Sequence, residues 1–215
     1  MKRLLSVLIM AILAGFAIGL GGSVFLAMLP ISKVLGAFLF TVGLFTVCTL
    51  NLNLFTGKAC YMFDNKPSYL FDLLIIWIGN LIGAWLIAFL IISTRLAPAF
   101  TEAAKGLVTT KNNDSLLSLF VLGMICNVLI YIAVENFRNN SNDFAKVLAL
   151  IFGVMVFILM GTEHSIADMY YYAVAGELFT ANGLIRIVII TLGNVTGGLI
   201  FPLSKKTAEK LTKRI

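Results

Sequence analysis

Charged residues are scarce in this chain, and that scarcity decides its class. Of 215 residues, 12% are charged and 60% are hydrophobic, and the mean hydropathy is +1.00. A soluble domain carries about 25% charged residues. The composition therefore excludes a soluble domain of ordinary composition and indicates an integral membrane protein.

Cysteine and proline are also rare. The three cysteines, Cys48, Cys60 and Cys126, lie in or beside apolar windows. Their odd number argues against a disulfide framework, and their spacing does not suit a metal. We expect them to pack as small apolar side chains, and we expect no metal and no cofactor. None of the four prolines follows an asparagine, although a water or polyol channel would be expected to carry paired Asn-Pro-Ala loops.

Six windows lack charge, and a bilayer core of about 30 Å needs about 20 helical residues. The chain is therefore predicted to be all-α with six transmembrane segments, the first of them a retained span rather than a cleaved signal. The fifth window is too short to cross as an unbroken helix. The windows are residues 4–29, 34–57, 73–94, 115–134, 147–162 and 187–204.

The chain has 16 basic and ten acidic residues, which gives a net charge of +6. The basic residues are distributed unevenly over the predicted loops. If both termini lie on one side, eleven basic residues share that side and five lie opposite. The positive-inside rule then places both termini on the cytoplasmic side of the membrane. We expect that membrane to be a bacterial inner membrane. Residues 205–215 form a basic tail that we expect at the lipid headgroups, so the charge does not indicate nucleic acid as a partner.

A short motif occurs once in each half of the chain. Gly79-Asn80-Leu-Ile-Gly83 lies in the third window, and Gly193-Asn194-Val-Thr-Gly197 lies in the sixth. Two halves of three spans each must thread the membrane in opposite directions, so residues 1–95 and 112–204 are predicted to form a 3+3 inverted repeat in a single domain. The glycine spacing also predicts that helices approach closely.

Polar residues interrupt the second and fifth windows, which are predicted to be broken helices. Residues 51–58 carry amides, a hydroxyl and a lysine, whereas residues 161–169 hold the sole histidine and two acidic residues. Matching interruptions in two halves point to a transport site. Ser165 to Asp168 fit a capping box, and Thr56 fits a cap of a second short helix. Two such helix starts would favour an anion between them.

Single polar residues admit two interpretations each. An ionisable group inside a span usually faces a pathway, which favours a pore role for His164. Glu163 is predicted to brace the broken segment by accepting backbone amides, with direct proton handling as the alternative. Asn127 either joins helices or lines a pore. Lys111, by default, is a solvated charge in a loop.

Four motifs in order resemble the formate/nitrite transporter family, which includes hydrosulfide channels. They are Leu54-Phe55-Thr56-Gly57, Gly123-Met-Ile-Cys126-Asn127, Glu163-His164-Ser165-Ile166-Ala167-Asp168-Met169 and Gly193-Asn194-Val-Thr-Gly197-Gly198. The resemblance covers essentially the whole chain. It implies an aquaporin-like fold, a homopentamer with one pore per protomer, and passage of small monovalent weak-acid anions.

The resemblance also implies roles for particular residues. His164 matches the central pore histidine, Thr56 its hydrogen-bonding partner, and Glu163 the acid that braces the loop. Asn127 matches a pore asparagine, and Lys111 matches a lysine that draws anions inward. The apolar residues that match the hydrophobic constrictions on either side of the histidine are Phe40, Leu44, Phe55, Ile130 and Phe157.

The sequence departs from the family pattern at Asn53, Lys58 and Asp168. A lysine directly after Thr-Gly resembles the pattern of the hydrosulfide branch, so formate, nitrite and hydrosulfide are all candidate substrates. Protons are a further partner if His164 protonates the anion. A hydrosulfide-specific channel and an aquaporin-like channel for neutral solutes are the alternatives. No serine lies in the Gly-x-Ser-Gly context of a membrane protease, so we do not expect an enzyme or catalytic residues.

Overall fold

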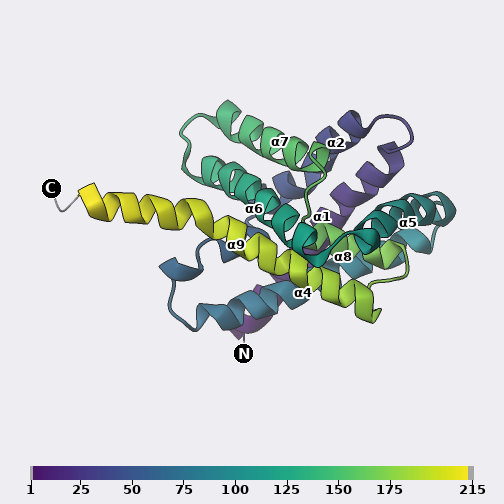
Figure 1. Cartoon of the computed structure of the whole chain (residues 1–215), viewed down its shortest axis with the longest axis horizontal. Coiled ribbons are helices and arrows are strands. Elements are labelled where there is room, and N and C mark those ends of the chain that lie inside the picture. The colour runs from purple at the N-terminus through teal and green to yellow at the C-terminus, as the bar shows by residue number, and fades with distance from the viewer. Residues whose placement is uncertain (1, 213–215) are drawn as a thin grey trace.

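Residues 2–212 are described by this computed structural model, and within them every regular element is helical (Figure 1). This confirms the predicted all-α class. The elements are α1 (Lys2–Met28), α2 (Lys33–Thr49), α3 (Phe55–Ala59), a 3-10 helix η1 (Met62–Asp64), α4 (Tyr69–Ile92), α5 (Ala97–Asn113), α6 (Leu116–Asn139), α7 (Asp143–Leu159), α8 (Ser165–Val174) and α9 (Ala181–Thr212).

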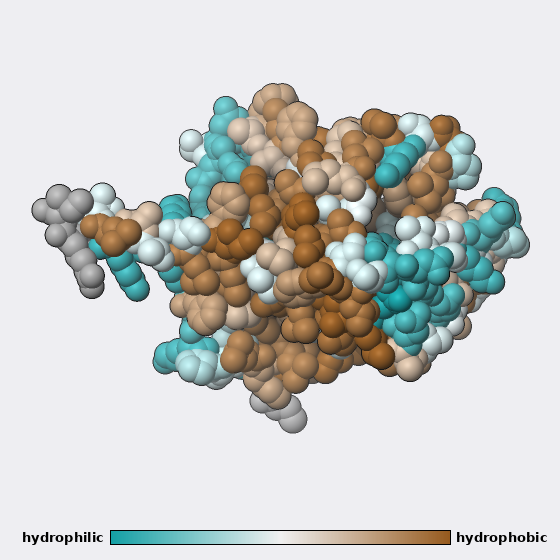
Figure 2. Space-filling model, viewed as in Figure 1, coloured by the Kyte–Doolittle hydropathy of each residue, from teal (hydrophilic) through white to brown (hydrophobic). Residues whose placement is uncertain are grey.

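Helices α1, α4, α6 and α9 are each long and apolar enough to cross a membrane, and α2 is a shorter apolar helix. A helix of 24 residues, the length of α4 and α6, spans roughly 36 Å, more than the hydrocarbon core. Hydrophobic residues cover the middle of the visible surface, and hydrophilic ones gather toward its ends, most of all around α5 and the start of α9 (Figure 2). Several apolar helices with this distribution indicate a multi-pass membrane protein.

The helices pack in two corresponding sets. Helix α1 packs along α2 and α4, as α6 packs along α7 and α9, and α2 meets α7 between the sets. The short helix α3 contacts α9, whereas α8 contacts α4, so each short helix reaches into the other set. These paired contacts support the inverted repeat of residues 1–95 and 112–204, which stays a prediction.

Glycines set the closest helix contacts, as their spacing predicted. A Cβ atom added to Gly197 on α9 would lie 1.9 Å from the carbonyl oxygen of Met124 on α6. A Cβ atom on Gly83 of α4 would lie 2.0 Å from the carbonyl oxygen of Ile12 on α1. Any larger residue would force these backbones apart, so glycine is required at both crossings.

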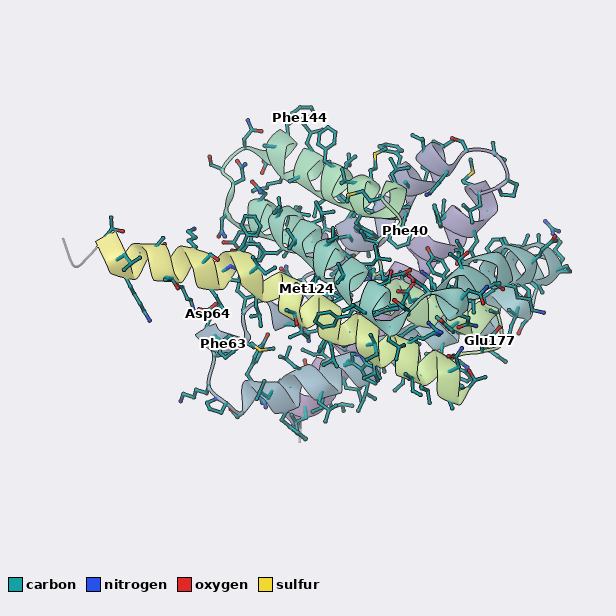
Figure 3. All side chains as sticks on the ribbon, viewed as in Figure 1. Phe40, Phe63, Asp64, Met124, Phe144 and Glu177 are labelled. Atoms are coloured by element: carbon teal, nitrogen blue, oxygen red, sulfur yellow. The ribbon has the colours of Figure 1, made fainter. Side chains whose placement is uncertain are left out.

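Two ion pairs join residues near the chain ends to η1 and to the first turn of α4. Arg3 binds Asp72 in the first turn of α4 at 2.8 Å, and Lys206 near the end of α9 pairs with Asp64. We call the end of the molecule that carries these pairs the terminal face. Figure 3 labels Asp64 at this end and Glu177, beside α5, at the other end, which we call the opposite face.

Candidate functional site

Two non-helical segments, which we call the interrupted segments, meet in the interior of the molecule. Residues 50–54 separate α2 from α3, and residues 160–164 separate α7 from α8. Each contains a left-handed turn, at Asn51 (φ 52°) and at Gly161 (φ 71°). The left-handed region suits glycine and asparagine best, which is why the chain turns at these two positions.

Asn80 and Asn194, the asparagines of the repeated motif, hold these two segments. The Asn80 side chain accepts the backbone N–H of Phe55 (2.8 Å) and donates to the carbonyls of Ala11 (2.8 Å) and Asn53 (2.9 Å). Asn194 accepts the N–H of Ser165 (2.9 Å) and donates to the carbonyls of Gly123 and Glu163, both at 2.8 Å. Each amide therefore satisfies backbone groups that a helix interruption would leave unpaired.

The sequence pattern alone does not predict this role for Asn80 and Asn194. Their motif predicts an internal repeat and close helix packing, and the packing concerns only its glycines. A signal was present, because an asparagine deep in an apolar window at the same place in both halves needs buried polar partners. Backbone groups of a broken segment are the natural partners.

His164 and Thr56 connect the two segments. The Nε2 atom of His164 lies 3.0 Å from the Oγ1 atom of Thr56, and both side chains are buried. The other ring nitrogen, Nδ1, accepts the backbone N–H of Ala167 at 3.1 Å. Because Nδ1 is an acceptor here, the ring is the neutral tautomer with its proton on Nε2, which donates to Thr56.

These contacts correct the predicted helix caps. Helix α8 begins at Ser165, as predicted, but its cap is the His164 ring, whose residue has the extended backbone that a cap requires (φ −107°, ψ 105°). Helix α3 begins at Phe55 with Leu54 in the cap position, so Thr56 lies inside the helix. The hydroxyl of Thr56 contacts His164 instead of capping.

Lys111 is buried, contrary to the default interpretation of a solvated loop charge. It lies in the last turn of α5 and pairs with Glu163 and with Asp168, whose Oδ1 atom is 3.0 Å from Nζ. A buried ammonium must be compensated by opposite charge, and this requirement overrides both predicted carboxylate roles. Asp168 does not complete a capping box, and the Glu163 carboxylate contacts Lys111 rather than backbone amides.

Asn127 bridges α3 and α9. Its side-chain amide donates to the carbonyls of Thr56 (3.1 Å) and Asn194 (2.7 Å). Its Oδ1 atom is buried and has no hydrogen-bond partner among residues 2–212. The amide therefore joins structural elements, as one interpretation predicted, and the pore role of Asn127 stays a prediction.

Aromatic rings enclose His164 on the side of the opposite face. Phe157 stacks on the His164 ring with centroids 5.8 Å apart, and Phe40 meets Phe157 edge-on at 6.1 Å. Figure 3 labels Phe40 where α2 approaches α7. A cavity of about 70 Å³, the opposite-face cavity, is lined by these three residues together with Lys111 and Asp168, among others. It is large enough for about two water molecules.

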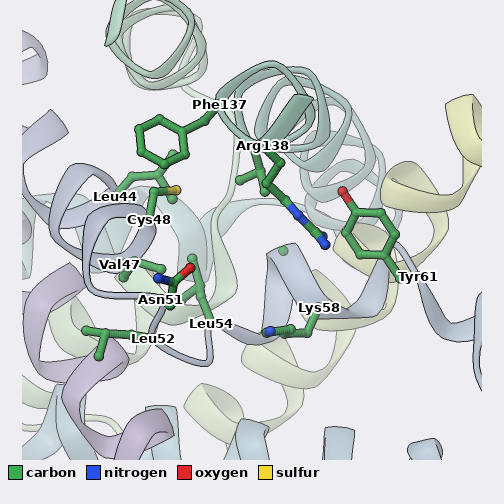
Figure 4. Close-up of a pocket in the computed structure, with 12 residues that line it drawn as sticks. Leu44, Val47, Cys48, Asn51, Leu52, Leu54, Lys58, Tyr61, Phe137 and Arg138 are labelled. Atoms are coloured by element: carbon green, nitrogen blue, oxygen red, sulfur yellow. The ribbon is translucent and has the colours of Figure 1, made fainter. Parts of the chain in front are cut away.

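A larger cavity of about 410 Å³, the terminal-face cavity, lies beyond the next turn of α2 (Figure 4). Leu44, one helical turn after Phe40, lines it, and so do Leu54, Gly57 and Lys58 from the first interrupted segment and α3. Phe40 and Leu44 therefore border different cavities. The contact between Thr56 and His164 joins the two interrupted segments. Phe55 and Ile130 are buried but line neither cavity.

The apolar helices around this buried polar cluster define a multi-pass membrane protein with a polar centre. Residues 1–204 match the family model described as "Formate/nitrite transporter". The chain is 31% identical over 196 residues to the uncharacterized transporter YwcJ of Bacillus subtilis, covering 84% of this chain and 76% of YwcJ. It is 30% identical over 133 residues to the nitrite transporter NirC of Escherichia coli, covering 58% of this chain and 49% of NirC.

Solved structures show the same fold. A pentameric formate channel with formate bound superposes with a TM-score of 0.83 at 23% identity and covers 98% of both chains. An FNT family ion channel gives a TM-score of 0.87 at 24% identity, covering 95% of this chain and 90% of that one. The chain belongs to the formate/nitrite transporter family. This confirms the resemblance seen in the sequence, and the family is one of transporters and channels.

Proposed function

We propose that the chain is a channel for small monovalent weak-acid anions, formate or nitrite, whose path passes between Thr56 and His164. The observation that carries the proposal is the 3.0 Å contact between these two side chains, one from each interrupted segment. A cavity lies toward each end of the molecule, the larger bordered by Leu44 and the smaller by Phe40. An anion crossing between them meets two polar hydrogens, the Nε2–H of His164 and the hydroxyl of Thr56.

Selectivity arises from apolar constrictions. Phe40 and Phe157 form the constriction on the His164 side, and Leu44, Phe55 and Ile130 form the one toward the terminal face. All five side chains are buried. Taking a charged group out of water costs several kcal/mol or more. A neutral acid crosses such a constriction far more easily than its anion does.

Proton assistance follows from the two ring nitrogens of His164. A proton delivered to Nδ1 would release the Ala167 amide and let the Nε2 proton move toward Thr56, whose own hydroxyl proton passes to the anion. The lost helix cap costs about 1 kcal/mol. Protonation also makes the buried ring an imidazolium, whose desolvation cost is offset when the anion lies beside it, so the proton transfer requires the anion to be in place.

Lys111 attracts the anion toward the opposite-face cavity, in the proposed scheme. Its ammonium lines that cavity together with His164 and Asp168. Glu163 and Asp168 hold the ammonium in place and, when both are ionised, outweigh its charge, so Lys111 acts on the anion by direct contact in the cavity rather than by a long-range field. Asn127, with an unused Oδ1 acceptor, is the pore residue on the Thr56 side of the path.

The proposed architecture has six crossings in a single domain, residues 1–215, of which residues 205–215 are the basic tail at the lipid headgroups. The crossings are α1, α2 with α3, α4, α6, α7 with α8, and α9. Residues 1–95 and 112–204 form the inverted repeat. Both termini lie on the cytoplasmic side of a bacterial inner membrane. We further propose a homopentamer, because the structure with a TM-score of 0.83 is described as a pentameric formate channel. Native mass spectrometry in detergent tests this stoichiometry.

The transport test uses proteoliposomes and labelled formate and nitrite, with glycerol and hydrosulfide as comparison solutes. The unaltered protein is expected to take up formate or nitrite faster as the pH falls toward the pKa of the acid, and to exclude glycerol. His164→Ala and His164→Asn are expected to lose the pH dependence and most of the rate. Unchanged rate and pH dependence in both variants would refute the role of His164.

A hydrosulfide-specific channel of the same family is the second candidate. The observation that favours it is Lys58, which follows the Thr56-Gly57 pair and lines the terminal-face cavity. Hydrosulfide uptake that exceeds formate and nitrite uptake by more than tenfold in the same proteoliposomes would select this candidate.

A further inference from the structure

The terminal-face cavity contains two cationic side chains that the transport mechanism does not use. Lys58 reaches it from α3, and Arg138 reaches it from the last turn of α6 (Figure 4). In the close-up the Arg138 guanidinium ends beside Tyr61, and the Lys58 side chain points toward the side of Leu54 and Asn51. The other lining residues are apolar or neutral polar, and none is acidic.

Neither cation has an acidic partner in the described part of the chain. Residues 2–212 contain no ion pair of Lys58 or Arg138, and no hydrogen bond from either side-chain nitrogen. The carboxylate of Glu135, one turn before Arg138, accepts the hydroxyl of Tyr61 at 2.6 Å instead. The Arg138 guanidinium lies over the Tyr61 ring, 4.7 Å from its centroid. This stacking orients the guanidinium, which forms no ion pair within residues 2–212.

The two ends of the molecule therefore differ in charge. At the opposite-face cavity the single ammonium of Lys111 is paired with two carboxylates, Glu163 and Asp168. At the terminal-face cavity two positive charges share low-dielectric walls that include Leu44, Val47 and Leu52. Walls of this kind focus the field of one sign and raise the local concentration of counter-ions.

We propose that the terminal-face cavity is an anion-binding site in which Arg138 and Lys58 hold one small monovalent oxyanion. The planar guanidinium offers two parallel N–H donors to the two oxygens of a carboxylate or nitrite, and the ammonium adds a point charge. The choice of formate or nitrite as the ligand rests on the proposed function. The charge difference makes anion capture stronger from the terminal face than from the opposite face.

The first test measures the field of the cavity without transport. Cys48 lines the same cavity and is half-buried, whereas Cys60 and Cys126 are buried. Its thiol is labelled with a sulfonate-bearing and with a trimethylammonium-bearing methanethiosulfonate, and the ratio of the two rates is taken. Both reagents attack the same thiolate, so the ratio cancels the intrinsic reactivity of the thiol. Cys48→Ser reports labelling elsewhere.

The anionic reagent is expected to be favoured in the unaltered protein. Lys58→Gln and Arg138→Gln should each lower the ratio of anionic to cationic labelling by about threefold to tenfold, as expected for removing one nearby charge. Lys66→Gln is the matched control, because Lys66 is exposed on the same face and does not line the cavity. A ratio that stays unchanged in both cavity variants would overturn the proposal.

The second test measures sided transport in vesicles of known orientation. Lys58→Gln and Arg138→Gln are expected to raise KM about tenfold for formate or nitrite applied to the terminal face, with little change in KM from the opposite face. Arg138→Lys should restore part of the effect. Equal changes in KM from both faces, or no change, would refute the site. If the unaltered protein transports neither anion while the labelling ratio still shifts, the proposed function fails and the anion site stands.

Discussion

The Nε2 atom of His164 lies 3.0 Å from the Oγ1 atom of Thr56, although 108 positions separate the two residues in the chain. The contact joins the last residue before α8 to the second residue of α3. Since Nδ1 of the same ring caps α8, the ring is fixed at both nitrogens. Its orientation therefore depends on both interrupted segments at once.

Removing the Thr56 hydroxyl is predicted to impair transport more than folding. Thr56→Val keeps the side-chain volume but removes the hydroxyl whose proton passes to the anion in the proposed scheme, so the rate should fall about a hundredfold. The unpaired Nε2–H lowers the free energy of unfolding by about 1–3 kcal/mol. Thr56→Ser keeps the hydroxyl and is expected to transport at close to the unaltered rate. Formate uptake into proteoliposomes measures both, with Thr196→Val on the exposed side of α9 as control. Equal rates for Thr56→Val and Thr56→Ser would contradict the role of the hydroxyl.

Removing the Lys111 ammonium is predicted to destabilise the fold strongly. Lys111→Gln leaves Glu163 and Asp168 buried together without a counter-charge, which costs about 3–5 kcal/mol. Lys105→Gln on the exposed side of the same helix should cost less than about 0.5 kcal/mol. Thermal unfolding in detergent compares the two. The reversal of this order would show that the buried ion cluster is not a structural requirement.

Asp168→Asn is predicted to strengthen anion entry at the opposite face. The substitution removes one of the two carboxylates beside Lys111, and Asp168 also lines the cavity that contains His164. Removing a negative charge from a small cavity should lower KM for formate or nitrite by about tenfold, provided that Glu163 still pairs with Lys111. Concentration-dependent uptake from that side measures KM. A higher KM in this variant would show that the carboxylate assists the anion rather than repelling it.

Asn80→Ala and Asn194→Ala are predicted to be destabilising to a similar extent. Each substitution removes three hydrogen bonds to backbone groups of an interrupted segment or its neighbour, and the orphaned groups raise the cost to about 3–5 kcal/mol. Asn113→Ala, at an exposed position, should be close to neutral. Unfolding in detergent tests all three. A large effect of only one of the two would contradict their equivalence.

Gly197→Ala and Gly106→Ala are predicted to act in opposite directions. The added Cβ at Gly197 would lie 1.9 Å from the Met124 carbonyl oxygen, so α6 and α9 must separate, at a cost of about 1–3 kcal/mol or more. At Gly106 nothing lies within 4 Å, and alanine in a helix interior is preferred by about 0.5–1 kcal/mol. Melting temperatures should therefore fall for the first variant and rise for the second.

Composition and local motifs were enough to predict the membrane class, the helical fold, the family and the start of α8 at Ser165. These properties follow from composition, from the length of apolar windows and from local motifs, all of which act over short stretches of chain. The sequence also predicted the close glycine crossings, because glycine spacing along one helix is visible without knowing the partner.

The pairing of the buried polar groups could not be predicted without the packing of distant helices. Lys111 binds carboxylates on the segment that precedes α8 and on α8 itself, Asn80 and Asn194 hold interrupted segments, and His164 rather than Ser165 caps α8. Local rules assigned caps and solvation from neighbouring residues. In a buried, low-dielectric interior each charge and each free backbone group must find a partner, and distant segments supply it.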